Sequence, residues 1–391
     1  MDTQALYDLS PALRLMGMGL VLAAGPLAWV WLRKRQASTA RRLQALTLLT
    51  LFLTFDLVLF GSFTRLTDSG LGCPDWPGCY GKASPVGARA EISAAQQAMP
   101  TGPVTHGKAW VEMIHRYLAT GVGVLILVLA IATWFEHARQ RRQAGAVAVP
   151  SPWWATLTLV WVCVQGAFGA LTVTMKLFPA IVTLHLLGGL LLLALLALQA
   201  VRYAQLHDTS ATRPLPQGLR TLMWVALALL TLQIALGGWV STNYAVLACT
   251  EFPTCQGSWW PEMNFAQGFE LWRELGLTAA GEHISFAALT AIHYVHRLAA
   301  YAVIAVFLVL AWRLRGLPAW HGPARWMAGL LLLQFLTGLS NVVLDWPLLA
   351  AVLHTGGAAA LVVVLTWSLA GSKTRRVTVR TPAPRVTGSA V

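Results

Sequence analysis

The chain has 391 residues, of which 57% are hydrophobic and only 11% are charged. A water-soluble protein of this length needs far more charge to cover its surface, so the composition excludes an ordinary soluble enzyme. The formal net charge of +13 is compatible with a nucleic-acid partner, but the basic residues are grouped between long apolar blocks.

Nine of these apolar blocks are long enough to cross the hydrocarbon core of a bilayer, about 30 Å thick, as helices of about 20 residues. In chain order they cover residues 12–32, 43–63, 109–134, 153–174, 180–201, 220–242, 285–312, 326–344 and 348–370. The sequence therefore predicts an all-α integral membrane protein.

The distribution of Lys and Arg predicts the orientation of these spans. Nineteen of the 28 basic residues lie in the segments 33–42, 139–142, 202–220, 313–325 and 373–385, which nine spans place on one side. By the positive-inside rule this side is cytoplasmic, so no nucleic-acid partner is needed. The N-terminus and the loops 64–108 and 243–284 are then periplasmic, and the C-terminus is cytoplasmic. The acidic start MDTQALYDLS is unlike a cleaved signal or a transit peptide, which favours a retained first span in a bacterial inner membrane.

Each of the two long loops carries a pair of cysteines. Cys73 and Cys79 share the first loop, and Cys249 and Cys255 share the second. Both loops are expected in an oxidising compartment, where such close pairs tend to form disulfides.

The chain also contains an internal repeat of four spans. Residues 61–81 match residues 237–257 at an offset of 176, and both cysteine pairs coincide. Further along the chain, His115-Arg116 matches His296-Arg297, and Gln165, Gly169, His185 and Gly188 match Gln334, Gly338, His354 and Gly357. Two copies that enter the membrane from the same side are related by a pseudo-two-fold axis along the membrane normal.

The repeat predicts the domain organisation. We expect two pseudo-symmetric four-helix transmembrane bundles, at residues 43–205 and 206–372, preceded by one extra N-terminal transmembrane helix and a basic loop at 1–42. The composition of residues 373–391 is typical of a disordered cytoplasmic tail.

Two pairs of histidines recur within the spans. His115 and His185 in the first copy become His296 and His354 in the second, each in the outer half of a span that runs inward. Two imidazoles at similar depth on different helices can hold a haem, one on each face of the iron. The alternatives are a hydrogen-bond partner between helices and a zinc site, which would need a third or fourth ligand.

Other residues near these histidines have two interpretations each. Arg116 and Arg297 are candidates for pairing with haem propionates, or for reaching toward the membrane interface. The glycines of the repeat either leave room for a flat macrocycle or allow close packing of helices.

The two copies differ at one informative position. Glu112 lies three residues before His115, whereas His293 lies three residues before His296. Residues at this spacing share a helix face, so Glu112 is either a proton-transferring group beside the first haem site or a structural carboxylate paired with an arginine or an interfacial hydroxyl. The difference suggests one reactive haem site and one site that only holds its haem.

The stretch TRLTDSGLGCPDWPGCYG, the EMIHR motif, the later histidines in spans and the doubled organisation closely resemble haem A synthase, an enzyme of cytochrome oxidase assembly in bacteria and mitochondria. The resemblance covers about residues 43–370. The chain departs from the family pattern at Met113, where the family usually has a tyrosine after the glutamate, and in its extra first span.

The resemblance implies an activity and a set of site residues. The family oxidises the C8 methyl group of haem O to a formyl group by successive hydroxylations, with water as the oxygen source. It implies that Glu112 is the catalytic carboxylate, that His115 and His185 ligate the substrate haem O, and that His296 and His354 ligate a resident haem b. It further implies disulfides Cys73–Cys79 and Cys249–Cys255.

The partners expected from the resemblance are membrane lipid, an electron acceptor that the sequence does not identify, and a haem O synthase that hands over the substrate. The sequence does not determine the oligomeric state. Two other functions remain open, a non-catalytic di-haem membrane cytochrome and a haem carrier. The first explains both histidine pairs but gives no role to the difference between Glu112 and His293.

Overall fold

The computed structural model describes residues 10–142, 151–206, 208 and 211–374. The long helices are α1 (Ser10–Arg33), α2 (Thr39–Leu66), α4 (His106–Arg141), α5 (Pro152–Thr174), α6 (Pro179–Gln205), α7 (Gln217–Thr242), α9 (Phe286–Leu314), α10 (His321–Val343) and α11 (Leu348–Gly371). The short elements are α3 (Arg89–Ala98), α8 (Phe265–Gly268), the 3₁₀ turns η2 (Ala245–Ala248) and η3 (Pro318–Trp320), and the strands β1 (Arg213–Leu215) and β2 (Ser372–Thr374).

Within these residues, nine helices are long and apolar enough to span a membrane, and each coincides with a predicted span. The prediction of an all-α, multi-pass membrane protein is confirmed. Most of the helices extend beyond the apolar blocks, and at two of them a polar side chain caps the first turn. Thr105 accepts a hydrogen bond from the backbone N–H of Lys108 at the start of α4, and Ser285 does the same for Ala288 at the start of α9.

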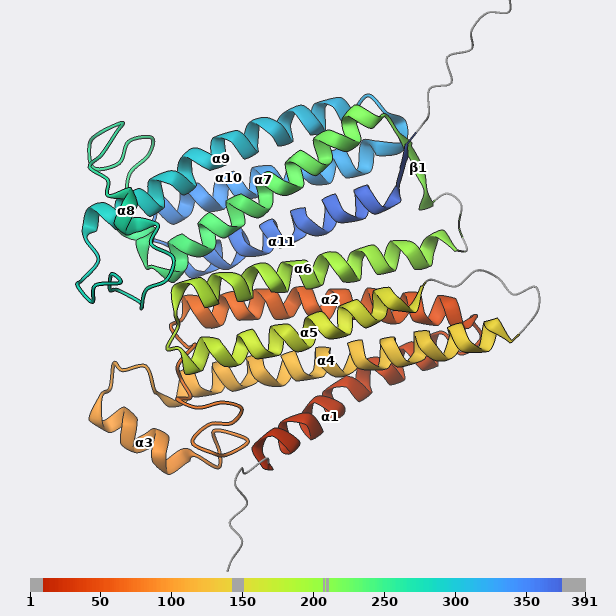
Figure 1. Cartoon of the computed structure of the whole chain (residues 1–391), viewed down its shortest axis with the longest axis horizontal. Helices are drawn as coiled ribbons and strands as arrows, with labels where there is room; N and C mark the ends of the chain where they lie inside the picture. Colours follow the sequence, from red (N-terminus) through yellow and green to blue (C-terminus); the bar gives the residue numbers. More distant parts are fainter. Residues whose placement is uncertain (1–9, 143–150, 207, 209–210, 375–391) are drawn as a thin grey trace, which may run out of the picture.

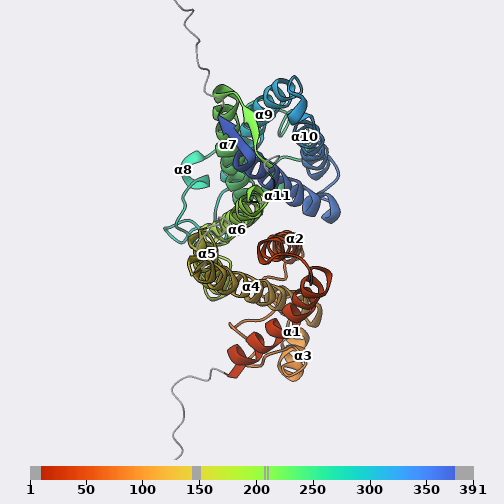
Figure 2. The same ribbon diagram turned by 90° about the vertical axis from the view of Figure 1, so that its right-hand side faces the viewer.

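Contacts between helices divide eight of these spans into two groups. The first group contains α2, α4, α5 and α6, and the second contains α7, α9, α10 and α11 (Figure 1). Equivalent neighbours occur in both groups, since α2 contacts α4 and α6 as α7 contacts α9 and α11. Figure 2 shows the groups side by side, with α6 and α11 next to each other between them.

Small and hydroxyl-bearing residues line the contact between the two groups. Ser62 of α2 donates a hydrogen bond to Thr355 of α11 across 3.1 Å. On the other side of the contact, Thr183 of α6 and Thr242 of α7 lie 3.3 Å apart. Side chains of this size allow membrane helices to approach closely and to hydrogen-bond across the contact.

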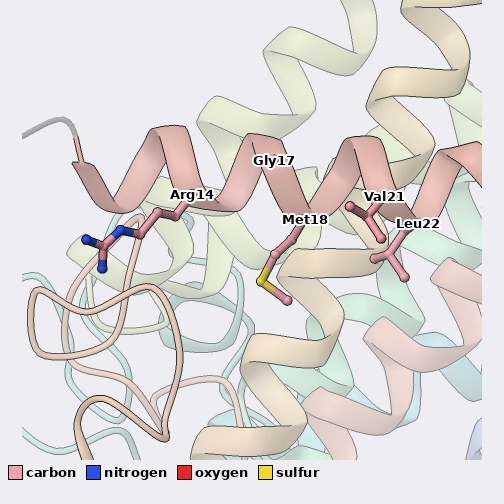
Figure 3. A pocket seen from close by; sticks show the side chains of 5 residues that line it. All are labelled: Arg14, Gly17, Met18, Val21 and Leu22. Atoms are coloured by element: carbon pink, nitrogen blue, oxygen red, sulfur yellow. The ribbon is translucent and has the colours of Figure 1, made fainter.

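Helix α1 lies outside both groups and packs mainly on α4. Gly19 of α1 lies against Thr120 of α4, with so little space that a Cβ atom at Gly19 would collide with the threonine methyl group. A surface depression of about 560 Å³ runs along α1 and is lined by Arg14, Gly17, Met18, Val21 and Leu22 (Figure 3). None of these five residues was predicted to belong to the functional site.

The two ends of the helices carry different kinds of structure. Both cysteine loops, together with α3 and α8, lie at one end, and β1 lies at the other (Figure 1). There β1 pairs in parallel with β2, with Arg213 opposite Ser372. Lys373 and Thr374, which were expected to belong to a disordered tail, are therefore part of a strand, and the rest of that expected tail lies outside the described residues.

Candidate functional site

Each of the four repeated histidines points at a glycine on a neighbouring helix. A Cβ atom added at Gly61 of α2 would lie 2.9 Å from His115 Nε2, and one added at Gly237 of α7 would lie 2.9 Å from His296 Cε1. Both distances are shorter than real Cβ contacts. A side chain at either of these glycines, which the repeat aligns, would therefore displace the imidazole ring beside it.

The second histidine of each group also faces a glycine, but less closely. A Cβ atom at Gly169 of α5 would lie 3.5 Å from His185 Cε1, an ordinary contact, and one at Gly338 of α10 would lie 3.1 Å from His354 Cε1. The other two glycines of the repeat, Gly188 and Gly357, lie against the side chains of Gln165 and Gln334. In the structure the space beside these four glycines is therefore occupied by side chains of neighbouring helices.

Within each group, the helix that carries one histidine contacts the helix that the other histidine faces. His115 of α4 lies against α2 and His185 of α6 lies against α5, while α2 contacts α6 and α4 contacts α5. His296 and His354 have the corresponding neighbours, α7 and α10, in the second group. Nowhere among residues 10–142, 151–206, 208 and 211–374 do three His, Cys, Asp or Glu side chains gather as a metal-ion site, so the zinc alternative finds no further ligands there. Paired imidazoles without other ligating side chains suit a macrocycle that supplies four ligands of its own.

Glu112 is buried, with only 4% of its surface exposed, and both carboxylate oxygens are bonded. Oε1 forms an ion pair with Arg116 one turn further along α4. Oε2 accepts a hydrogen bond of 2.8 Å from the backbone N–H of Cys73. The carboxylate therefore joins α4 to the first cysteine loop, immediately beside the helix turn that carries His115. Its predicted catalytic role stays a prediction.

Both repeat arginines hold the cysteine loops. Arg116 Nη1 donates to the carbonyl oxygens of Asp75, Pro77 and Gly78, at 2.9, 3.1 and 2.5 Å. Arg297 Nη1 donates to the carbonyl oxygens of Glu251 and Thr254, at 3.0 and 2.9 Å. These bonds give each guanidinium a structural role, and the predicted pairing with haem propionates stays a prediction.

The loops themselves are closed by two disulfides, Cys73–Cys79 and Cys249–Cys255, as expected. All four cysteines are fully buried. The carbonyl groups that bind Arg116 and Arg297 lie within or next to these closed loops, so the disulfide and the arginine fix the same segment.

The structure explains the missing tyrosine at Met113. In the second group Tyr294, the counterpart of Met113, donates its hydroxyl to the Trp259 carbonyl oxygen. In the first group Tyr117, one turn beyond Met113, donates to the Ala83 carbonyl oxygen at 2.8 Å. Ala83 and Trp259 are equivalent at the offset of 176. The same bond to the loop is made from a different helical position.

His293, the counterpart of Glu112, takes a different partner. Its Nδ1 lies 3.0 Å from the carbonyl oxygen of Ala245. The difference noted in the sequence is thus a real difference of chemistry, a buried carboxylate in one group and a buried imidazole in the other.

A polar cluster that the sequence analysis missed joins the two groups. Arg65 forms an ion pair of 3.3 Å with Asp68, and its Nη2 donates to the Ser241 carbonyl oxygen at 2.6 Å. Tyr244 donates to Asp68 at 2.6 Å, and burial raises the pKa of its hydroxyl. Arg65 and Ser241, and Asp68 and Tyr244, are repeat-equivalent pairs, so the repeat alignment carried the signal.

Comparisons with known proteins agree with this geometry. Residues 44–366 match the family model described as "Cytochrome oxidase assembly protein". A protein of Shewanella oneidensis named "Heme A synthase" is 40% identical over 324 residues, which cover 81% of this chain and 92% of that protein. Proteins of the same name from Methylobacterium sp. and Rhizorhabdus wittichii are 28% and 26% identical, and each covers 85% of this chain.

Proposed function

Since the chain belongs to the family of cytochrome oxidase assembly proteins that includes the heme A synthases, we propose that it converts haem O to haem A. The proposed reaction oxidises the C8 methyl group of the porphyrin to a formyl group. The observation that carries the proposal is the presence of two paired-histidine sites, whose rings are half-buried, combined with a buried carboxylate, Glu112, beside only one of them.

The proposal assigns the two sites to different haems. His115 and His185 of the first group bind the substrate haem O, and His296 and His354 of the second group hold haem b. The fit is supported by the glycine opposite every ring and by the apolar helices around them. When bound, haem b supplies one-electron transfer, and the ligands set its potential.

The oxidation of a methyl group to a formyl group removes four electrons and four protons in total and takes its oxygen from water. The first hydroxylation gives an alcohol and the second a gem-diol, which loses water. The electrons pass to an acceptor outside this chain. Each round releases protons close to the reacting carbon, so a buried base near the substrate is the group the chemistry needs most.

Glu112 is the proposed base. Each of its oxygens keeps a lone pair beyond the bonds to Arg116 and to the Cys73 N–H, so the ionised carboxylate can still accept a proton. Arg116 pairs with the carboxylate, and the guanidinium is itself bound to three loop carbonyls. The negative charge of the Glu112 carboxylate also stabilises the positive charge that develops at the methyl carbon during the reaction.

The proposed setting is a bacterial inner membrane. The cluster of Lys and Arg between spans favours a cytoplasmic C-terminus and periplasmic cysteine loops. Substrate would come from a haem O synthase, and membrane lipid surrounds the helices.

Purification of the intact protein, followed by extraction and chromatography of its haems, tests the proposal. Haems O and A together with haem B are the expected result. Haem B alone, even when the expressing cells make haem O, would refute the synthase assignment and favour a di-haem cytochrome. Haem that is bound and released without chemical change would favour a carrier.

A further inference from the structure

The histidine pairs of the two groups differ in the polar side chains that lie beside their ring nitrogens. In the second group both rings have a polar side chain at Nδ1. Thr337 Oγ1 lies 3.0 Å from His354 Nδ1, and the Gln233 amide nitrogen lies 3.1 Å from His296 Nδ1. Among the residues that the structure describes, no hydrogen bond reaches either ring of the first group, and His185 Nδ1 is buried without a partner.

The threonine determines which nitrogen of His354 carries a proton. A hydroxyl group has a single proton to donate, and Thr337 donates it to the Leu333 carbonyl oxygen at 2.7 Å. Toward His354 the hydroxyl oxygen must therefore accept, so the proton of the ring lies on Nδ1. The lone pair of Nε2 is then available to a metal. The backbone of the same residue is held as well, because Gln334 donates to the His354 carbonyl oxygen at 2.8 Å.

Gln233 supports the other ring of the second group. Its amide nitrogen donates to the His296 carbonyl oxygen at 3.0 Å and approaches the ring, while its Oε1 is buried and without a partner in the described chain. The same amide nitrogen lies 3.1 Å from Nδ1 and 3.4 Å from Nε2 of the His296 ring, so Gln233 positions His296 through its backbone carbonyl and the edge of its ring.

The repeat shows what the first group has instead. Thr337 directly precedes Gly338, and Phe168 directly precedes Gly169. Gln233 lies four residues before Gly237, and at the same position before Gly61 the first group has Leu57. Two apolar residues thus stand in place of the two polar ones, on helices that carry the same repeated glycines and face the same histidines.

We propose that Thr337 and Gln233 are positioning residues that retain the haem of the second group, and that Phe168 and Leu57 leave the haem of the first group exchangeable. A hydrogen bond from Nδ1–H to an oxygen fixes the plane of a ligating imidazole and makes Nε2 a better donor. A histidine without that bond holds iron less firmly, and this suits a site that must release its product. The inference rests on the proposed function for the identity of the two haems.

The experiment uses the purified, haem-loaded protein and its Thr337→Val variant, in which the hydroxyl is replaced by a methyl group of nearly the same shape. Transfer of haem b to added apomyoglobin measures the dissociation rate, and a redox titration measures the reduction potential. We expect dissociation roughly 10–100-fold faster than in the wild type. Without this hydrogen bond His354 is a weaker electron-pair donor and stabilises ferric iron less, so the reduction potential of haem b should shift upward.

Three further variants make the test specific. Thr337→Ser keeps a hydroxyl and should retain the wild-type dissociation rate and reduction potential. Gln233→Leu should accelerate the dissociation of haem b even when Thr337 is intact. Phe168→Thr should slow the release of haem from the first group. Wild-type dissociation and potential in both Thr337→Val and Gln233→Leu, in protein with wild-type helical content, would overturn the inference. These measurements need no conversion of haem O. The retention inference can therefore fail while the synthase activity is confirmed, and it can hold while the synthase activity is refuted.

Discussion

Replacement of Glu112 by glutamine separates the catalytic role of this residue from its structural one. Glutamine keeps an oxygen for the Cys73 N–H and removes the negative charge that pairs with Arg116. If Glu112 takes protons from the substrate, formyl production should fall by roughly 10²–10⁴-fold, the usual contribution of a positioned base. Haem should remain bound, because no iron ligand is changed.

The cost in stability can be estimated from the same contacts. Removal of one partner from a buried ion pair typically costs about 3–5 kcal/mol. Here Arg116 retains three carbonyl acceptors and the Cys73 N–H retains its partner, so we expect a smaller loss, about 1–3 kcal/mol. Thermal unfolding in detergent would measure it, and chromatography of extracted haems would measure the product.

Arg116→Gln is the matched control. It breaks the same ion pair from the other side and also frees the loop carbonyls, so it should destabilise the protein at least as much as Glu112→Gln. It leaves the carboxylate in place, however, so product formation should fall far less. Equal losses of product in the two variants, in proportion to their losses of stability, would refute the role of Glu112 as a base and leave it as a structural carboxylate.

Other predictions follow from the pairing of rings, glycines and loops. His296→Ala should abolish the b-type absorption of the purified protein, and an unchanged spectrum would exclude it as a ligand. Gly237→Ala should weaken the same absorption without loss of the helical fold, because the new methyl group displaces the His296 ring from a distance of 2.9 Å; full retention of haem would contradict this. Replacement of Cys73 and Cys79 by serine should lower the free energy of unfolding by about 2 kcal/mol, as expected for a short closed loop, and preserve activity under reducing conditions. Complete loss of turnover in a folded double variant would instead indicate a redox role for this disulfide.

The sequence was sufficient for the spans and for the repeat that relates the histidines of the two halves. A bilayer requires long apolar helices whose backbone groups are satisfied internally, so span 180–201 could be recognised without knowledge of its neighbours. His185 and His354 could be matched because polar residues are rare in such helices and few of them coincide by chance.

The neighbours of each side chain were decided only by the tertiary structure. These helices are apolar on nearly all faces, so hydrophobic periodicity does not show which face meets which partner. For that reason the ring of His115 against Gly61, and the hydroxyl of Thr337 at His354, could not be derived from the pattern.

The side chains that contact the cysteine loops could not be derived from the sequence either. The sequence left two interpretations for Arg116, a haem propionate or the membrane interface, and the structure places it among three backbone carbonyls of the first cysteine loop. Met113 looked like the loss of a tyrosine, yet Tyr117 makes the equivalent bond one turn away. The sequence alone established which residues are repeated, because residue identity and spacing can be compared without knowledge of the structure. The tertiary structure decided which of them touch, because contacts between helices depend on rotation and depth that an apolar sequence does not encode.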